Sequence, residues 1–170
     1  MTRMLVLSVF PFLLVYAAIS DFRTYRLPNW LNGLIFISFF PVAFIAGMPM
    51  DVMVWHLAAF GVVLLGCFIL FAFDLFGGGD AKMLAASALW IGWGEDLATF
   101  IIYTALAGGV LAIIMKGWQM FRIEQGVWGT DGALRQVLNL KLDLPYGAAI
   151  ATGALLAFPQ TWWHAIIMAG

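Results

Sequence analysis

The chain has 170 residues, of which 64% are hydrophobic and only 10% carry a charge. Because soluble domains contain about 25% charged residues, this composition indicates an integral membrane protein. The net charge is -1, without the excess of Lys and Arg typical of nucleic-acid-binding proteins, so we expect no nucleic-acid partner. The single Cys67 and the two distant histidines, His56 and His164, argue against a disulfide framework and a zinc site, and no metal or cofactor is predicted.

Six apolar segments approach the roughly 20 residues that a membrane-spanning helix needs. In chain order they cover residues 4–20, 30–47, 54–73, 81–93, 97–115 and 145–168. The fourth is short for a full span, and Pro159 is expected to kink or end the sixth. Asn29 after Pro28 is expected to cap the second helix, and Pro145 suits the first turn of the sixth. We therefore predict an all-α membrane protein with six transmembrane helices in a single domain, residues 1–170.

The distribution of positive charge predicts how these helices are oriented. If the connections after the first, third and fifth helices are cytoplasmic, that side holds seven Lys and Arg residues and the other side only Arg3. The positive-inside rule then places both termini outside the cytoplasm, in the periplasm of a Gram-negative cell. A cleaved signal peptide is the alternative for the N-terminus, but its apolar stretch is long and basic residues follow it directly.

The tryptophans fall near the predicted ends of the helices. Five lie at outer ends (Trp55, Trp90, Trp93, Trp162 and Trp163) and three at inner ends (Trp30, Trp118 and Trp128). This distribution is typical of interfacial aromatic belts, although ordinary helix packing would also explain it. Residues 116–144 form the only long polar stretch, with a short amphipathic helix expected over 133–142. We interpret it as a loop on the membrane surface; an element that covers the site or holds substrate is the alternative.

Two acids stand out against this apolar background. Asp21 ends the first apolar segment, and Asp80 follows the third in the run Gly77-Gly78-Gly79-Asp80. Two membrane crossings separate them, so both are predicted at the cytoplasmic face, whereas both histidines fall near the opposite face. An acid next to the bilayer is costly and by default indicates a functional site.

Paired carboxylates suit the hydrolysis of a peptide bond without a metal. One ionised carboxylate takes a proton from the attacking water, and the other, still protonated, donates a hydrogen bond to the scissile carbonyl. Two close like charges cannot both ionise easily, so the pair holds one shared proton. Asp80 opens a helix, where the dipole favours an anion, and Asp21 closes one. We therefore expect Asp80 to be the base and Asp21 to carry the proton.

The residues around Asp80 allow more than one interpretation. Glycines at 77–79 can adopt a positive φ and let a substrate strand approach, although a plain turn with Asp80 as helix cap is the alternative. Asp74, one turn earlier, competes with Asp80 for the catalytic position, but a loop acid is the preferred interpretation. Lys82 is expected to anchor the chain at the cytoplasmic face and could tune the acid pair electrostatically.

The two acidic segments resemble known signatures. Asp21 with Arg26-Leu27-Pro28-Asn29 resembles the first signature of the type IV prepilin peptidases. The run from Gly77 through Asp80 and Lys82 to Ala86 resembles the second, the GxGD motif with its trailing lysine, which presenilin-type proteases share. Pro145-Tyr146-Gly147 resembles a third, weaker signature. The resemblance extends over nearly the whole chain.

This resemblance implies a function and a set of site residues. Family members are six-helix membrane aspartyl peptidases that remove short basic leaders from prepilins at the cytoplasmic face of the bacterial inner membrane. Asp21 and Asp80 match the two catalytic acids, and the supporting motif residues are Gly77, Gly79, Lys82, Pro28 and Asn29. Larger members carry paired CxxC motifs and also methylate the new N-terminus. With one cysteine, this chain resembles the compact Tad/Cpa type, which implies peptidase activity only, a Flp-type prepilin as substrate, and the lipid bilayer and pilus assembly machinery as partners.

Two alternatives remain open from the sequence. A preflagellin peptidase or a presenilin-like protease would use the same chemistry on another substrate. A transporter or assembly scaffold would use its acids without hydrolysis, and it would need a polar path across the membrane. The motif acids instead share one face, and Asp51, Glu95 and Asp96 fall in outer turns, so hydrolysis is the preferred interpretation.

Overall fold

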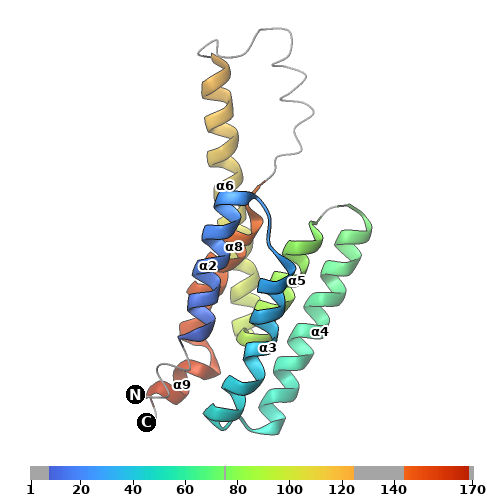
Figure 1. Cartoon of the computed structure of the whole chain (residues 1–170), viewed down its shortest axis with the longest axis vertical. Coiled ribbons are helices and arrows are strands. Elements are labelled where there is room, and N and C mark those ends of the chain that lie inside the picture. Colours follow the sequence, from blue (N-terminus) through green and yellow to red (C-terminus); the bar gives the residue numbers. More distant parts are fainter. Residues whose placement is uncertain (1–7, 75, 125–143, 169–170) are drawn as a thin grey trace.

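The computed structural model describes residues 8–74, 76–124 and 144–168, and every regular element in these ranges is a helix (Figure 1). The all-α prediction is confirmed for this part of the chain. The helix expected over 133–142 lies outside the described residues. In chain order the elements are α2 (Val9–Thr24), α3 (Asn29–Ala46), α4 (Met50–Ala72), α5 (Gly78–Ile91), α6 (Glu95–Glu124), α8 (Tyr146–Ala157), the 3₁₀ turn η1 (Phe158–Gln160) and α9 (Trp162–Met168).

Three of these helices are long and apolar enough to cross a membrane. They are α3, α4 and the part of α6 that runs from Glu95 to Trp118. The helices α2, α5 and α8 contain 16, 14 and 12 residues, which is fewer than the roughly 20 of a full span. The structure thus supports a membrane protein with three spanning helices, beside which three shorter helices pack.

The two shortest of these helices form the centre of the bundle. Helix α5 packs against α3, α4 and α8, and α8 packs against α2 and α6. Both central helices are rich in alanine and glycine, which let neighbouring backbones approach closely. A Cβ atom on Gly153 of α8, for example, would lie only 2.6 Å from the backbone nitrogen of Thr104 in α6. The centre of the molecule is therefore packed with small side chains.

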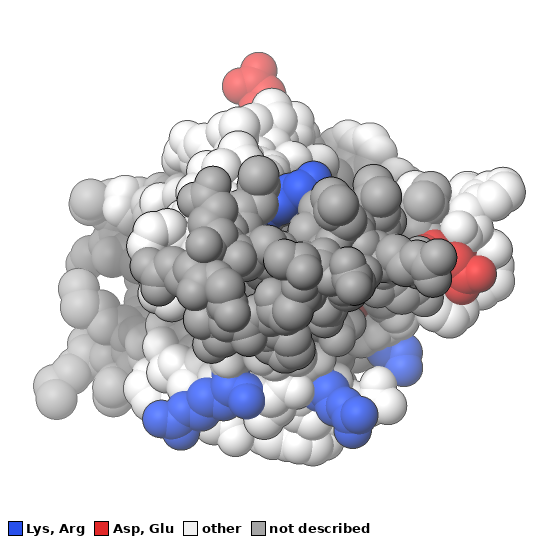
Figure 2. Space-filling view, turned by 90° about the horizontal axis from the view of Figure 1, so that it is seen from above, with Lys and Arg blue, Asp and Glu red and all other residues white. Residues whose placement is uncertain are grey.

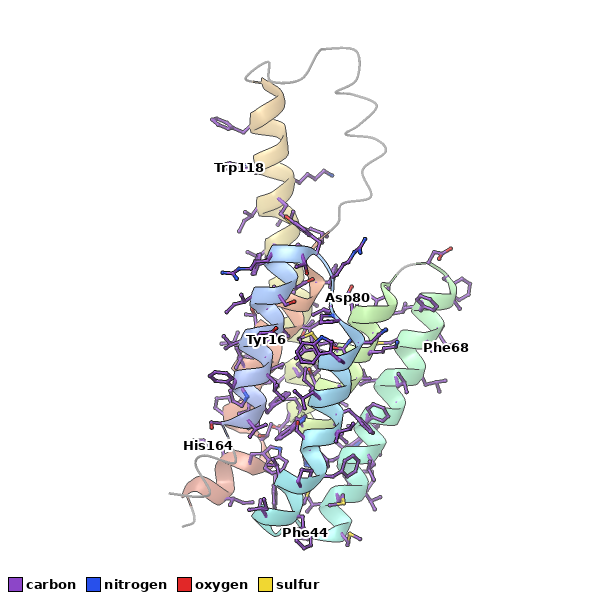
Figure 3. All side chains as sticks on the ribbon, viewed as in Figure 1. Tyr16, Phe44, Phe68, Asp80, Trp118 and His164 are labelled. Atoms are coloured by element: carbon purple, nitrogen blue, oxygen red, sulfur yellow. The ribbon has the colours of Figure 1, made fainter. Side chains whose placement is uncertain are left out.

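Large apolar side chains cover the outside. Phe68 on α4 is 64% exposed and Ile113 on α6 is 74% exposed, and many others on these helices are similar. Figure 3 shows Phe68 and Phe44 directed away from the bundle. A continuous apolar surface of this kind is rare on soluble proteins and suits contact with lipid.

An aromatic cluster fills the bundle at the lower end of Figure 1. The Trp90 indole stacks on Phe10 with ring centroids 4.7 Å apart, and its Nε1–H donates to the Ile35 carbonyl at 2.8 Å. The Nε1–H of Trp163 donates to the Trp90 carbonyl at 2.6 Å. Both indoles are fully buried, so the prediction that they belong to an interfacial belt is wrong. These two indole rings can be buried in the bundle because each indole N–H donates a hydrogen bond to a carbonyl group. Trp55, by contrast, is exposed as expected.

Several helix boundaries differ from the predicted ones in ways that affect the acids. Helix α2 continues to Thr24, so Asp21 lies inside its last turn and not at its end. Helix α5 begins at Gly78, which places Asp80 in its first turn. Pro28, and not Asn29, occupies the position before α3, so the predicted cap is wrong. The expected break in the last helix is confirmed, because the 3₁₀ turn containing Pro159 separates α8 from α9.

Candidate active site

Asp21 lies where the end of α2 meets the beginning of α8. Its side chain is only 3% exposed, and the backbone N–H of Ala148 donates to its Oδ2 at 3.1 Å. A Cβ atom on Gly147 would lie 2.9 Å from the same oxygen, so a glycine at this position leaves room for the carboxylate. Asp21 therefore occupies the N-terminal end of α8, where free N–H groups and the helix dipole favour an anion.

Asp80 lies in the first turn of α5 and folds back over the residue before the helix. A Cβ atom on Gly77 would lie 2.7 Å from its Oδ2, so the carboxylate occupies the space of a missing side chain. Gly77 has φ -70°, and Gly78 and Gly79 are helical, so the predicted positive φ is wrong for this run. Gly77 instead lets the Asp80 carboxylate approach the backbone closely. Figure 3 shows Asp80 at the end of the bundle where α2 finishes and α5 begins.

The two acids share one electrostatic environment. Burial and, to a smaller extent, the charge of Asp21 together raise the pKa of Asp80 to about 6. Burial also raises the pKa of Asp21, but hydrogen bonds from the backbone of Ala148 and Gly147 oppose that increase. Both acids lie in helix-end turns outside the three spanning helices. One proton held between them, mainly on Asp80, is the state that this arrangement favours.

This result reverses the proton assignment expected from the sequence. That expectation considered only the dipole of the helix carrying each acid. In the folded chain Asp21 also meets the N-terminus of α8, a different helix, which stabilises its ionised form. For Asp80, burial and the nearby charge of Asp21 both disfavour the ionised form. The structure therefore favours an ionised Asp21 and a proton on Asp80.

Two polar contacts fix the start of α5 against α3. The Nδ2–H of Asn32, a residue 4% exposed, donates to the carbonyl of Gly79 at 2.9 Å. The Nζ of Lys82 donates to Asn29 Oδ1 at 2.9 Å. Lys82 is therefore held by α3, and burial and Asp21 account for the shift of the Asp80 pKa. The motif residues Asn29 and Lys82 position the helix that carries Asp80.

Sequence reasoning missed three residues of this site. Asn32 was visible as a polar residue in an apolar helix, one turn after Asn29. Leu27 belongs to the quoted first signature, and its side chain lies between Gly79 and Gly147. Ala148 gave no signal, because it contributes only its backbone N–H.

Other candidate residues lie elsewhere. Asp74 is exposed in the turn after α4, with φ 56°, and does not share the buried site. His56 is on α4 and His164 is on α9, at the end opposite Asp80 (Figure 3). Within the described ranges, no group of three or more His, Cys, Asp and Glu side chains could hold a metal ion.

Figure 2 shows, from above, the end of the molecule that carries the acids, with Lys and Arg side chains gathered mostly along one edge. Arg23 is in the last turn of α2, Arg26 follows it, and Lys82 is in the second turn of α5. This end therefore presents basic side chains near the two acids, and we call Arg23, Arg26 and Lys82 the basic rim.

The family model described as the type IV leader peptidase family matches residues 8–113. The chain belongs to this family. The matched region includes both acids and the contacts between α3 and α5 that position Asp80. Membership of the type IV leader peptidase family indicates that the protein is a protease. The family resemblance expected from the sequence is confirmed. Comparisons with curated proteins and with solved structures gave no match.

Proposed function

We propose that the protein is a membrane aspartic endopeptidase that removes the short basic leader of Flp-type prepilins. The observation that carries this proposal is the pairing of the buried Asp21 with the half-buried Asp80, whose carboxylates interact electrostatically, in a chain of the type IV leader peptidase family. The pair supplies an anion and a proton within one site, which is what water-dependent cleavage of a peptide bond needs.

In the proposed reaction Asp21 is ionised and Asp80 is protonated. Asp21 removes a proton from water as the water oxygen attacks the scissile carbonyl carbon, and Asp80 gives its proton to the carbonyl oxygen. The tetrahedral intermediate then collapses: the C–N bond breaks, and the leaving nitrogen takes the proton held by Asp21. A hydroxyl proton of the intermediate returns to Asp80. One water molecule is consumed, and both acids recover their starting states.

We propose that six helical segments cross the membrane as one domain, with the acids at the cytoplasmic face. Arg23, Arg26 and Lys82 lie at the same end as the acids, which the positive-inside rule favours as the cytoplasmic one. Both termini then lie in the periplasm of a cell with two membranes. Both acids lie just outside the apolar segments 4–20 and 81–93, at the level of the interface.

The substrate follows from where the acids lie. A prepilin has a basic leader inside the cell followed by an apolar helix in the membrane, so its scissile bond lies at the cytoplasmic interface. The single cysteine, Cys67, is buried in α4, which supports the compact type without methyltransferase activity. The cleaved pilin would pass to the pilus assembly machinery. Preflagellin and presenilin-like substrates remain the alternatives within the same chemistry.

The proposal is tested by expressing the chain together with a Flp-type prepilin and following leader removal by mobility shift. We expect cleavage by the wild type and by Asp74→Asn, the exposed control, and none by Asp21→Asn or Asp80→Asn at equal membrane levels. Cleavage that survives in either of the last two variants would overturn the mechanism. Cleavage of a preflagellin but not of the Flp-type prepilin would overturn the substrate assignment alone.

A further inference from the structure

A cavity lies at the end of the bundle opposite the two acids, where α5 ends and α6 begins. Its volume is about 300 Å³, and its lining includes Trp55, Trp93, Trp162, His56 and Asp96. At a rise of 1.5 Å per residue along α5, this end lies roughly 18 Å from Asp80. The peptide hydrolysis proposed above uses none of these residues, so the cavity needs an explanation of its own.

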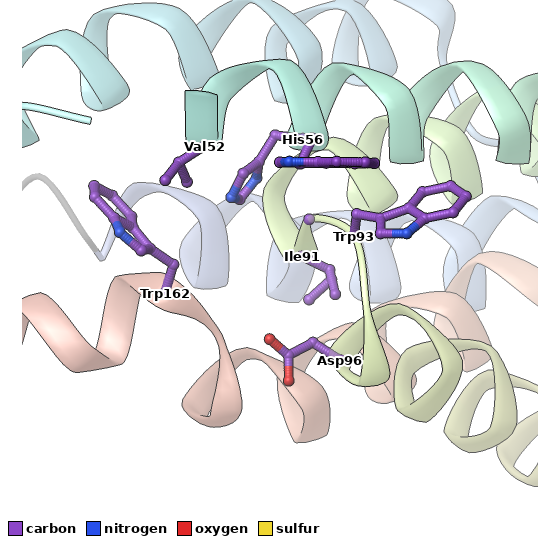
Figure 4. A pocket seen from close by; sticks show the side chains of 8 residues that line it. Val52, His56, Ile91, Trp93, Asp96 and Trp162 are labelled. Atoms are coloured by element: carbon purple, nitrogen blue, oxygen red, sulfur yellow. The ribbon is translucent and has the colours of Figure 1, made fainter. Parts of the chain in front are cut away.

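The cavity combines indole rings with one carboxylate. Trp55 and Trp93 lie with ring centroids 6.1 Å apart, and Trp162 lines the opposite side (Figure 4). Figure 4 also shows the Asp96 carboxylate directed toward the space between these rings. The residues that line the cavity include no Lys or Arg, so the carboxylate is not neutralised from within the cavity wall. The faces of indole rings attract cations, and a carboxylate adds a full negative charge.

The histidine in the wall adds a further hydrogen-bond acceptor. His56 is 3% exposed, and its Nδ1 lies 2.7 Å from the carbonyl oxygen of Leu89. Because a carbonyl can only accept, Nδ1 must carry the proton, and Nε2 of the neutral ring is then an acceptor. Gly92, with φ +88°, passes directly over this edge of the ring: a Cβ there would lie 2.9 Å from Nε2. The wall therefore holds two acceptors and three aromatic rings.

We propose that this cavity binds an organic ammonium cation of the choline or ethanolamine type. The cationic group lies against the faces of Trp55, Trp93 and Trp162, and Asp96 neutralises its charge. The cavity volume is within the range of small-molecule sites. Tryptophans at a membrane interface lie at the level of the lipid headgroups, so the cation can come from a lipid headgroup or from a free amine. The site is independent of the peptidase chemistry.

The neighbouring acid Glu95 provides a matched control. Both Glu95 and Asp96 lie in the first turn of α6 and interact with its dipole, but only Asp96 lines the cavity. A role limited to helix stabilisation would make the two acids equivalent. A role in ligand binding would make Asp96 alone necessary.

The first experiment uses the full chain in nanodiscs of phosphatidylglycerol, a lipid without an ammonium group. Choline is added, its affinity is measured by calorimetry, and the melting temperature is followed by tryptophan fluorescence. We expect choline to bind and raise the melting temperature, and we expect no response to its neutral isostere, in which carbon replaces the nitrogen. Asp96→Asn should weaken choline binding by at least about tenfold, whereas Glu95→Gln should leave it unchanged.

A second arm identifies the source of the cation by replacing phosphatidylglycerol with phosphatidylcholine of the same acyl chains. A higher melting temperature in phosphatidylcholine, lost in Asp96→Asn, supports a lipid headgroup; a response to free choline alone supports a soluble amine. Trp93→Leu keeps the carboxylate and should also weaken binding. The proposal is overturned if neither form of the ligand acts, if the isostere acts like choline, or if Asp96→Asn responds like the wild type. None of these readouts depends on leader cleavage.

Discussion

Asp21 and Asp80 are each placed by a neighbour that has no side chain. Asp21 fills the space beside Gly147, and Asp80 fills the space over Gly77. The partners of the two acids then differ: Asp21 accepts a backbone N–H from the start of α8, whereas Asp80 is half-buried near the charge of Asp21. These two environments separate the roles of otherwise identical side chains.

The raised pKa of Asp80 has a consequence for stability. Its value moves from 3.8 to about 6 on folding, so folding disfavours its ionised form. Stability is therefore greatest below about pH 4 for this group and falls as the pH rises through about 6. We expect Asp80→Asn to stabilise the protein by about 1–3 kcal/mol at pH 7.5 and to have little effect at pH 4.

This prediction is checked by thermal unfolding in nanodiscs at both pH values. Asp74→Asn removes an exposed carboxylate and serves as the control, with no change expected at either pH. A lower melting temperature of Asp80→Asn at pH 7.5 would show that the charged Asp80 contributes favourably to the fold.

The same pKa predicts the pH dependence of the reaction. Asp80 must be protonated to donate to the carbonyl oxygen, so kcat/KM should fall on the alkaline side with an apparent pKa of about 6. On the acid side it should fall as Asp21 becomes protonated, which gives a bell-shaped profile that belongs to the pair. The measurement is initial-rate cleavage of a purified prepilin over pH 4–9. Activity that keeps rising to pH 9 would contradict the assignment of Asp80 as the proton donor.

At the scale of the elements, the beginning of α8 is part of the site. A methyl group at residue 147 would lie 2.9 Å from Asp21 Oδ2 and 2.7 Å from Leu27 Cδ1. We expect Gly147→Ala to displace the carboxylate and to lower kcat/KM by about 10- to 100-fold, because small misplacements of catalytic groups are costly.

The control is Gly109→Ala in α6, where an added Cβ meets no atom within 4 Å. Alanine favours a helix over glycine, so this variant should fold at least as well as the wild type and keep its activity. Equal kcat/KM values for the two variants would show that α8 does not position Asp21.

The positions of the helices were largely predictable from the sequence, but the tertiary contacts between them were not. Apolar stretches bounded by proline and glycine located α3, α4 and α5 to within a few residues. The contact of Asp21 with α8 joins residues 127 positions apart in the chain, and a backbone N–H carries it. Likewise, Trp90 looked interfacial because it lies near a helix end, but in the folded chain it is fully buried and donates a hydrogen bond to the Ile35 carbonyl. Tertiary partners of this kind leave no local pattern.

At the scale of the whole molecule, short helices lie inside longer ones. Helices α5 and α8 occupy the centre, and α4 and α6 present large apolar side chains to the outside (Figure 1). This arrangement brings the ends of α2, α5 and α8 together beneath the basic rim, so that a polar reaction can take place at the edge of an apolar body.

The proposed orientation predicts that both termini lie outside the cytoplasm. Alkaline phosphatase fused after residue 170 should be active, since the enzyme folds only in an oxidising compartment. The same enzyme fused after Tyr25, in the connection from α2 to α3, should be inactive. The reverse pattern would place Asp21 and Asp80 at the periplasmic face and contradict the proposed substrate.

The central claim is that Asp21 and Asp80 act as one catalytic unit. It is tested most directly by comparing kcat/KM of the purified wild type with Asp21→Asn, Asp80→Asn and the double variant on one prepilin. We predict that each single variant loses at least about 1,000-fold and that the double variant loses no more, because residues that act together are not additive. Losses that multiply in the double variant, or substantial cleavage by either single variant, would contradict the account.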